Sequence, residues 1–327
     1  MRVRRNVLAV TDDLLVLRAL GIGDLLVAVP ALRGLRRAHP RGRLVLATPG
    51  WLAPLVRLVG GIDELLATDG LDALRWPHGG PRLAVNLHGR GPQSIAAVRA
   101  CHPAAIISHS HPRFPDLDGP AWVEEVHEVT RWARLLEHHG VAVAHDDLDL
   151  RPPEVPSPAP GAVVIHPGAS AAARRWPVSR FAAVAAALAG DGGRVVITGS
   201  SADVPAAERI AREAGLPADT VLAGRTDLAE LAALVAAADL VVSGDTGVGH
   251  LATAYRTRSV LLFGPVSPAR WGPVRDHDRH RVLWAGASGD PPSGDPHGGR
   301  PDDALLRLTA PRVLDAARDL LVRVEAR

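Results

Sequence analysis

Short apolar runs alternate with amphipathic segments along most of this chain. A continuous apolar run predicts a strand buried on both faces, and apolar residues spaced three or four positions apart predict a helix packed on one side. The alternation therefore predicts an α/β fold built on parallel sheets. The expected strands are residues 14–20, 44–48, 65–67, 83–86, 104–108, 162–166, 194–198, 240–242 and 259–263. The expected helices are residues 25–35, 53–59, 93–100, 124–138, 178–189, 204–214, 227–236, 251–255 and 311–324.

A proline-rich stretch divides this alternation into two series. Five prolines fall within residues 151–160, where neither a helix nor an interior strand can hold them. A chain of 327 residues also exceeds the usual size of a single core. We expect a Rossmann-like domain over residues 1–151, a linker over 152–160, a second Rossmann-like domain over 161–310 and a final helix over 311–327. Residues 286–301, rich in glycine, proline, aspartate and serine, are expected to form a mobile loop.

Composition refines this picture and excludes one class of partner. Hydrophobic residues make up 47% of the chain but aromatic residues only 3%, so the core must be built from alanine, valine and leucine. All 37 basic residues are arginine, yet the formal net charge is only +2. No run of arginines is interleaved with aromatic residues, as a groove for single-stranded nucleic acid requires. We therefore expect no nucleic-acid partner.

Cysteine usage and hydropathy indicate a cytoplasmic protein. Cys101 is the only cysteine, which excludes an intrachain disulfide. Asp12 and Asp13 stand where a secretory signal would be apolar. No apolar run approaches the ~20 residues that a membrane span needs. Peripheral contact with the inner face of a membrane stays open.

The turn at Asp245, Thr246 and Gly247 is the first candidate site. It follows the apolar run 240–242 and Ser243-Gly244 and precedes a helical segment. This order places Thr246, Gly247 and the next backbone N–H groups at a helix start beside the carboxyl end of a strand, where phosphates bind well. A helix cap without any ligand is an equally good interpretation of this stretch alone.

Two further glycine turns follow strands in the first domain. Gly21-Ile22-Gly23-Asp24 and Gly89-Arg90-Gly91 are expected at one edge of the sheet. The first turn invites comparison with the dinucleotide-binding fingerprint, but Leu26 occupies the position of its third glycine. No acidic residue ends the next strand to bind a ribose, which makes a dehydrogenase a weak alternative.

Several sequence blocks together resemble glycosyltransferase family nine, the heptosyltransferases of the lipopolysaccharide inner core. The resemblance runs from about residue 14 to residue 273 and is weakest over residues 52–145. The blocks are Gly21-Ile22-Gly23-Asp24-Leu25-Leu26, Pro30-Ala31-Leu32, His166-Pro167-Gly168-Ala169, Arg174-Arg175-Trp176-Pro177, Asp245-Thr246-Gly247 with His250-Leu251, Phe263-Gly264-Pro265 and Trp271-Gly272-Pro273.

The resemblance implies a GT-B fold, in which two Rossmann-like domains face a cleft. It also implies an inverting, metal-independent transfer from a nucleotide diphosphate sugar, with ADP-heptose as the donor, and no cofactor. The C-terminal domain would bind the donor, and the N-terminal domain would bind a saccharide or glycolipid acceptor. The residues themselves identify neither the base nor the acceptor.

On the acceptor side, the resemblance makes Asp24 the candidate catalytic base. An inverting transferase needs a group that takes the proton from the attacking hydroxyl. A carboxylate in the first turn of a helix is favoured as the anion by the helix dipole. The alternative is a helix-capping aspartate. Gly23, His88 and Arg90 are expected on the same side of the site.

On the donor side, Thr246 and Gly247 would bind the diphosphate, and Asp245 the hydroxyls of the sugar. His250 would contact the leaving phosphate, with a packed structural histidine as the alternative. Arg174 stands where the family usually has lysine, and it would offset the charge that grows on the diphosphate. Ser170 is a further phosphate candidate. Trp176 and Trp271 are expected to brace loops.

Three Asp-x-Asp triplets raise the alternative of a metal-dependent sugar transferase. They begin at Asp116, Asp147 and Asp276, and we expect them to be solvated loop charges instead. Two other functions remain open, namely a nucleotide-sugar epimerase on the same architecture and a sugar-nucleotide-binding module without activity. The joint presence of Asp24, Arg174 and Asp245 disfavours the inactive module.

Overall fold

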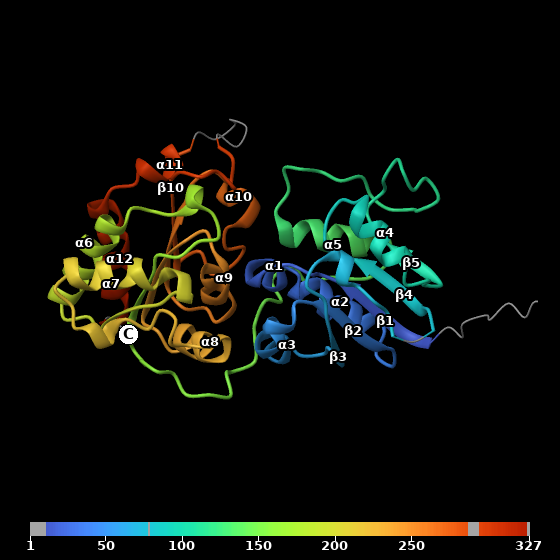
Figure 1. The fold of residues 1–327 in the computed structure, drawn as a ribbon, viewed down its shortest axis with the longest axis horizontal. Coiled ribbons are helices and arrows are strands. Elements are labelled where there is room, and N and C mark those ends of the chain that lie inside the picture. Colours follow the sequence, from blue (N-terminus) through green and yellow to red (C-terminus); the bar gives the residue numbers. More distant parts are fainter. Residues whose placement is uncertain (1–10, 78, 287–293, 326–327) are drawn as a thin grey trace, which may run out of the picture. The chain divides into compact units, whose positions relative to one another are not determined.

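The computed structural model describes residues 11–77, 79–286 and 294–325. Its chain forms two compact units, residues 1–148 and 149–327 (Figure 1). Each unit contains one five-stranded sheet whose paired strands are all parallel, with helices on both faces. Residues 151–160 belong to the second unit, and residues 287–293 of the loop expected over 286–301 lie outside the described residues.

The first unit has the strand order β3-β2-β1-β4-β5. Leu15 and Leu17 of its central strand pack in one cluster with Val98, while Leu14 and Val16 point to the opposite face and are equally buried. Its strands are β1 Thr11–Leu17, β2 Arg43–Thr48, β3 Glu64–Ala67, β4 Pro81–Asn86 and β5 Ala105–Ile107. Its helices are α1 Ile22–Val27, α2 Val29–Ala38, α3 Ala53–Val59, α4 Gln93–Arg99 and α5 Glu128–His138.

The second unit has the strand order β10-β9-β8-β6-β7, and its helices form layers on the two faces of this sheet (Figure 1). Its strands are β6 Val163–His166, β7 Val195–Ile197, β8 Leu240–Gly244, β9 Ser259–Phe263 and β10 His280–Trp284. Its helices are α6 Val178–Gly190, α7 Val204–Glu213, α8 Leu228–Ala236, α9 Gly247–Ala254, α10 Pro268–Trp271, α11 Asp303–Leu306 and α12 Ala310–Glu325. In Figure 1, α6, α7 and α12 lie on one face of the sheet, and α8 and α9 lie on the other.

The structure corrects one predicted helix start and confirms another. The helix expected from residue 25 begins at Ile22 and gives way to a second helix at Val29, because Pro30 lacks an N–H and fits only the first turn of a helix. The helix start expected at Thr246 and Gly247 is confirmed, because α9 begins at Gly247 and includes the apolar residues from 251 onward. Strand β10 was not expected, and it extends the sheet by pairing with β9.

The Asp-x-Asp triplets differ from the predicted solvated loop charges. In each triplet, at least one aspartate forms an ion pair with an arginine. Among the described residues, no group of three or more histidine, cysteine or acidic side chains is placed to hold a metal ion. The ion pairs are Asp116–Arg99, Asp147–Arg33, Asp147–Arg37, Asp149–Arg256, Asp149–Arg275, Asp276–Arg256 and Asp276–Arg275.

No described helix is long and apolar enough to cross a membrane.

Candidate functional site

In the second unit, the carboxyl ends of neighbouring strands bring the donor-side candidates to one edge. His166, the last residue of β6, pairs with Ser243 in β8, and Gly244 pairs with Leu262 in β9. The loops that follow β6 and β8 therefore start side by side. Ligands of parallel α/β sheets bind outside these strand ends.

The start of α9 presents an unsatisfied polar group. Thr246 is the N-cap residue with an extended backbone, yet its side chain makes no capping hydrogen bond. Its Oγ1 atom is buried without a hydrogen-bond partner in the part of the chain that the structure describes. The first N–H groups of a helix also lack partners within the helix, and its dipole favours an anion there. This arrangement suits a phosphate oxygen.

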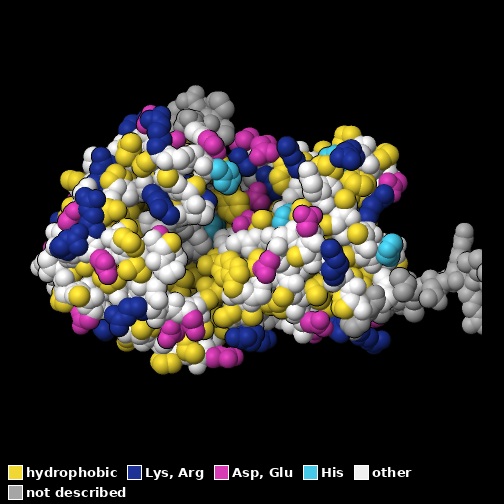
Figure 2. Space-filling model, viewed as in Figure 1, with side chains coloured by type: hydrophobic (Ala, Val, Ile, Leu, Met, Phe, Trp, Pro, Cys, Tyr) yellow, Lys and Arg dark blue, Asp and Glu magenta, His cyan; other side chains and the backbone are white. Residues whose placement is uncertain are grey.

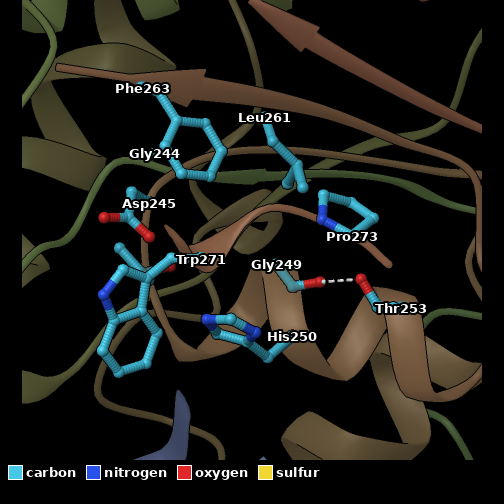
Figure 3. Close-up of a pocket in the computed structure, with 10 residues that line it drawn as sticks. Gly244, Asp245, Gly249, His250, Thr253, Leu261, Phe263, Trp271 and Pro273 are labelled. Atoms are coloured by element: carbon cyan, nitrogen blue, oxygen red, sulfur yellow. Dashed lines mark hydrogen bonds between the residues drawn. The ribbon is translucent and has the colours of Figure 1, made fainter. Parts of the chain in front are cut away.

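A hollow lies beside this helix start (Figure 3). About 210 Å³ of space outside the protein atoms lies in it, and part of this space is open to solvent, so the hollow is shallow and could hold only part of a nucleotide sugar. The His250 ring lies edge-on to Trp271, with ring centroids 5.8 Å apart. Trp271 therefore lines the hollow instead of only bracing a loop. The lining residues are Gly244, Asp245, Thr246, Gly249, His250, Thr253, Leu261, Phe263, Trp271 and Pro273.

Arg174 reaches the same edge from the loop after β6. It ends a short 3₁₀ helix, Ala172–Arg174, and donates a hydrogen bond to the Ser170 hydroxyl. Its Nε atom is buried and has no hydrogen-bond partner among the described residues. A Cβ atom added to Gly244 would lie only 3.1 Å from the Arg174 carbonyl oxygen, so glycine permits this close approach. Ser170, Arg174 and the β8–α9 turn therefore lie together.

Two residues at this edge received no role from the sequence. Burial lowers the pKa of His166 to about 4, so its imidazole is neutral at pH 7. Asp203 accepts hydrogen bonds from the Ser200 N–H at 2.9 Å and from its hydroxyl at 2.7 Å. A Cβ atom at Gly168 would lie 2.5 Å from an Asp203 carboxylate oxygen, so the glycine after His166-Pro167 is required for this packing. The sequence therefore showed Gly168 within a motif, but it did not show that Asp203 packs against this glycine.

In the first unit, Asp24 lies in the first turn of α1. One carboxylate oxygen accepts a hydrogen bond from the Gly21 N–H at 3.3 Å, and the other accepts one from Nη2 of Arg18 at 3.1 Å. Asp24 therefore caps the helix, but from the third helical position, since Gly21 is the N-cap residue. The Asp24 side chain keeps 29% of its surface exposed, so it is accessible to a substrate hydroxyl. The sequence did not identify Arg18.

The loop after β4 places His88 near this carboxylate. Asn86 is buried, and its amide donates to the Ser94 hydroxyl at 3.1 Å while its oxygen accepts the His88 N–H at 3.2 Å. Burial and the Arg18 charge lower the pKa of His88, while Asp24 raises it. His88 Nδ1 is buried and unpaired within the described chain. Gly23 lies in α1 beside Asp24, whereas Arg90 is exposed further along the loop.

The candidate residues thus form two groups, one in each unit. Gly23, Asp24, His88 and Arg90 belong to the first unit, and the donor-side candidates belong to the second. Trp176 lies outside both groups, because it is buried and donates to the Leu308 carbonyl at 3.0 Å, which confirms that it braces a loop. On the face drawn in Figure 2, basic and acidic side chains are interspersed over both units.

The chain is similar in sequence to known heptosyltransferases. The family model described as glycosyltransferase family 9 (heptosyltransferase) matches residues 119–290. Lipooligosaccharide heptosyltransferase 2 of Haemophilus influenzae is 34% identical over 156 residues, which cover 46% of this chain and only 44% of that relative. Lipopolysaccharide heptosyltransferase 2 of Salmonella typhimurium is 25% identical over 350 residues and is matched over 96% of its length, against 92% of this chain.

Solved structures share the fold along nearly the whole chain. A family 9 glycosyltransferase from Veillonella parvula has a TM-score of 0.78 at 21% identity, covering 97% of this chain and 100% of that one. E. coli ADP-heptose lps heptosyltransferase II has a TM-score of 0.74 at 22% identity, covering 96% and 99%. The fold is therefore GT-B, with two Rossmann-like domains.

Proposed function

The chain belongs to glycosyltransferase family 9, and from this premise we propose that it transfers a heptose-like sugar from a nucleotide diphosphate to a hydroxyl acceptor. The observation that carries the proposal is the start of α9, where the buried Thr246 hydroxyl lacks a hydrogen-bond partner among the described residues. A diphosphate oxygen would satisfy this hydroxyl and the first N–H groups of the helix. ADP-heptose is the proposed donor, since a relative of the same fold is named as an ADP-heptose enzyme.

In the proposed reaction, Asp24 acts as the general base. It takes the proton from the acceptor hydroxyl while that oxygen attacks the anomeric carbon from the side opposite the diphosphate. The bond between the anomeric carbon and the diphosphate oxygen breaks, and the nucleoside diphosphate leaves with the electron pair. The configuration at the anomeric carbon is therefore inverted.

The second unit would stabilise the leaving diphosphate. Arg174 supplies a positive charge beside Ser170, and Thr246 and the N–H of Gly247 supply hydrogen bonds. Asp245, whose carboxylate repels phosphate, is assigned to the hydroxyls of the sugar, and His250 to the leaving phosphate. These cationic and N–H groups would take the place of a divalent metal, so we propose a metal-independent reaction without a cofactor.

The acceptor is proposed to be a saccharide or glycolipid bound by the first unit. We place the reaction in the cytoplasm, because the single buried cysteine fits a reducing compartment. A glycolipid acceptor would bring the enzyme to the inner face of a membrane.

The test is release of ADP from ADP-heptose, with and without saccharide acceptors, in excess EDTA. Acceptor-dependent release with an inverted glycoside as product is the expected result. Loss of activity that magnesium or manganese restores would contradict metal independence. Epimerised donor without ADP release would indicate an epimerase, and a donor that only raises the melting temperature would indicate a binding module.

Asp24→Asn tests the base itself. The amide keeps the shape of the carboxylate but cannot accept the proton, so kcat should fall by about 10²–10⁴. Donor affinity should be unchanged, since the donor-side candidates lie in the other unit. The melting temperature should also fall, because Arg18 loses its anionic partner. Asp227→Asn, which changes the capping box of α8, is the control for the loss of a capping carboxylate alone. Near-normal transfer by Asp24→Asn would remove Asp24 from the mechanism.

A further inference from the structure

Arg18 is a buried cation whose contacts converge on the proposed base. Arg18 directly follows the last residue of β1, and only 1% of its surface is exposed. Nη2 lies 3.1 Å from Oδ1 of Asp24, and Nε donates to the main-chain carbonyl of the same residue at 2.9 Å. The guanidinium therefore binds both the side chain and the main chain of Asp24.

The rest of its surroundings hold Arg18 in place. Nη1 donates to the Leu87 carbonyl, and the guanidinium lies 4.8 Å from the centre of the Trp132 ring. Its main chain is fixed between strand ends, because its N–H donates to Ala47 at 2.9 Å and its carbonyl accepts the Thr48 hydroxyl at 2.9 Å. A side chain with this many partners has no second rotamer available without breaking them.

Burial lowers the pKa of the Arg18 guanidinium, and the neighbouring Asp24 and Glu128 carboxylates raise it again. An arginine is effectively always protonated in proteins, so the cation persists at this position. An enzyme that needed only a capping aspartate would not require a buried cation on its second oxygen, because the Gly21 N–H already completes the cap.

We propose that Arg18 is a positioning residue, which fixes the carboxylate plane of Asp24 for proton transfer from the acceptor hydroxyl. The inference rests on the proposed role of Asp24 as the base. Each carboxylate oxygen offers two lone pairs. Arg18 occupies one on Oδ1 and Gly21 occupies one on Oδ2, so both oxygens are oriented while each keeps a lone pair for the substrate.

The test compares Arg18→Met and Arg18→Lys with the wild type, measuring kcat, donor KM and melting temperature on each preparation. We expect Arg18→Met to lower kcat by about 10²-fold, the cost of a base displaced by about 1 Å, with an unchanged donor KM. Arg18→Lys keeps the charge but not the planar fork, so it should recover part of this loss. A merely structural arginine would lower the melting temperature and leave kcat intact.

Arg131→Lys is the matched control. Arg131 is as buried as Arg18, pairs with Glu128 at 2.7 Å and lies 3.9 Å from the Trp122 ring centre. Within the described part of the chain, it makes no hydrogen bond or ion pair with Asp24. It should lose stability while kcat stays within about twofold, because the base keeps its alignment.

Asp24→Asn, measured in parallel, separates the two ways to fail. If Asp24→Asn is inactive and Arg18→Met stays within threefold of the wild-type kcat, the positioning role is overturned and the base stands. If Asp24→Asn transfers normally, the base and the positioning role both fall. If Arg18→Met does not fold, Arg18→Lys decides: a lower kcat at an unchanged donor KM supports the inference, and a wild-type kcat overturns it.

Discussion

Two adjacent arginines, Arg174 and Arg175, differ sharply in what they can do. Arg174 has a buried Nε atom and donates to Ser170 at the edge of the hollow. Arg175 is exposed, donates to the Ala169 carbonyl at 3.0 Å and lies 4.0 Å from Asp203. Of these two arginines, Arg174 alone has a buried donor without a hydrogen-bond partner among the described residues, and a diphosphate oxygen would both accept from it and neutralise its charge.

Arg174→Ala should therefore raise the donor KM and lower kcat. A hydrogen bond to a charged group contributes about 1.5–3 kcal/mol, which corresponds to about 10–150-fold in kcat/KM. Arg174→Lys should keep much of the activity, because the charge remains. Steady-state kinetics with varied donor measure this, and Arg175→Ala is the control. Equal kinetics for Arg174→Ala and Arg175→Ala would make Arg174 an ordinary loop residue.

At the scale of elements, two helix starts in the second unit differ in how their N-cap side chains are bonded. Asp227 at the start of α8 accepts the Glu230 N–H at 2.8 Å, which completes a capping box. Thr246 at the start of α9 makes no such bond. A buried hydroxyl left without a partner costs free energy in the unliganded protein, and a ligand removes that cost.

Thr246→Val separates binding from folding. Valine keeps the shape and removes the hydroxyl, so the free energy of unfolding should be unchanged or slightly higher. Donor affinity should fall about 10-fold, the loss expected for one hydrogen bond to a charged group. Calorimetric titration with ADP and thermal melting measure the two effects. Asp227→Ala should do the reverse, losing about 0.5–2 kcal/mol of stability while it binds ADP normally. Unchanged ADP binding by Thr246→Val would contradict the phosphate site.

The sequence predicted elements well where local signals agreed. The junction of β8 and α9 was predicted because an apolar run stops at a glycine and a hydroxyl residue. Gly249 lies in the first turn of α9. In the structure it is a helical residue packed so tightly that an added Cβ would lie 2.9 Å from Leu261. Arg18 was missed because no local pattern encodes its contact with Asp24, and its other partners, Leu87 and Trp132, are distant in sequence.

At the scale of the whole molecule, the chain passes from the first unit to the second between Leu148 and Asp149. Just before this point, Asp147 is held within the first unit by Arg33 and by Arg37, the latter at 2.8 Å. Burial raises the pKa of Asp147, but the hydrogen bonds from Arg37 and Arg33 outweigh it and leave the pKa below its ordinary value.

Just after this point, Asp149 is held within the second unit. Arg256 binds both of its oxygens at 3.1 Å, and Arg275 binds one of them at 2.6 Å. The hydrogen bond from Arg256, aided by Arg275, lowers the pKa of Asp149. Of the two carboxylates in this Asp-x-Asp triplet, one is thus bound by arginines of the first unit and the other by arginines of the second unit. These ion pairs give the motif a structural role instead of a metal-binding one.

Buried histidines in both units make the stability of the whole molecule depend on pH. Burial lowers the pKa of His109 in the first unit and of His280 in the second to about 4. The unfolded chain protonates histidine near its ordinary pKa of about 6.5. Their stabilisation is therefore complete above about pH 6.5 and is lost as the pH falls towards 4, by up to roughly 3 kcal/mol for each residue.

The melting temperature should therefore fall steadily between about pH 6.5 and pH 4.5, above the range in which the paired aspartates titrate. Replacing one buried imidazole, as in His109→Gln or His280→Gln, should lower stability at pH 7 but flatten this acid slope. His297→Gln is the control, because the imidazole it removes is exposed to water in the folded protein. Thermal melts in buffers of matched ionic strength measure the slopes. Variants whose curves run parallel to the wild type would show that His109 and His280 are not the groups that bind protons on unfolding.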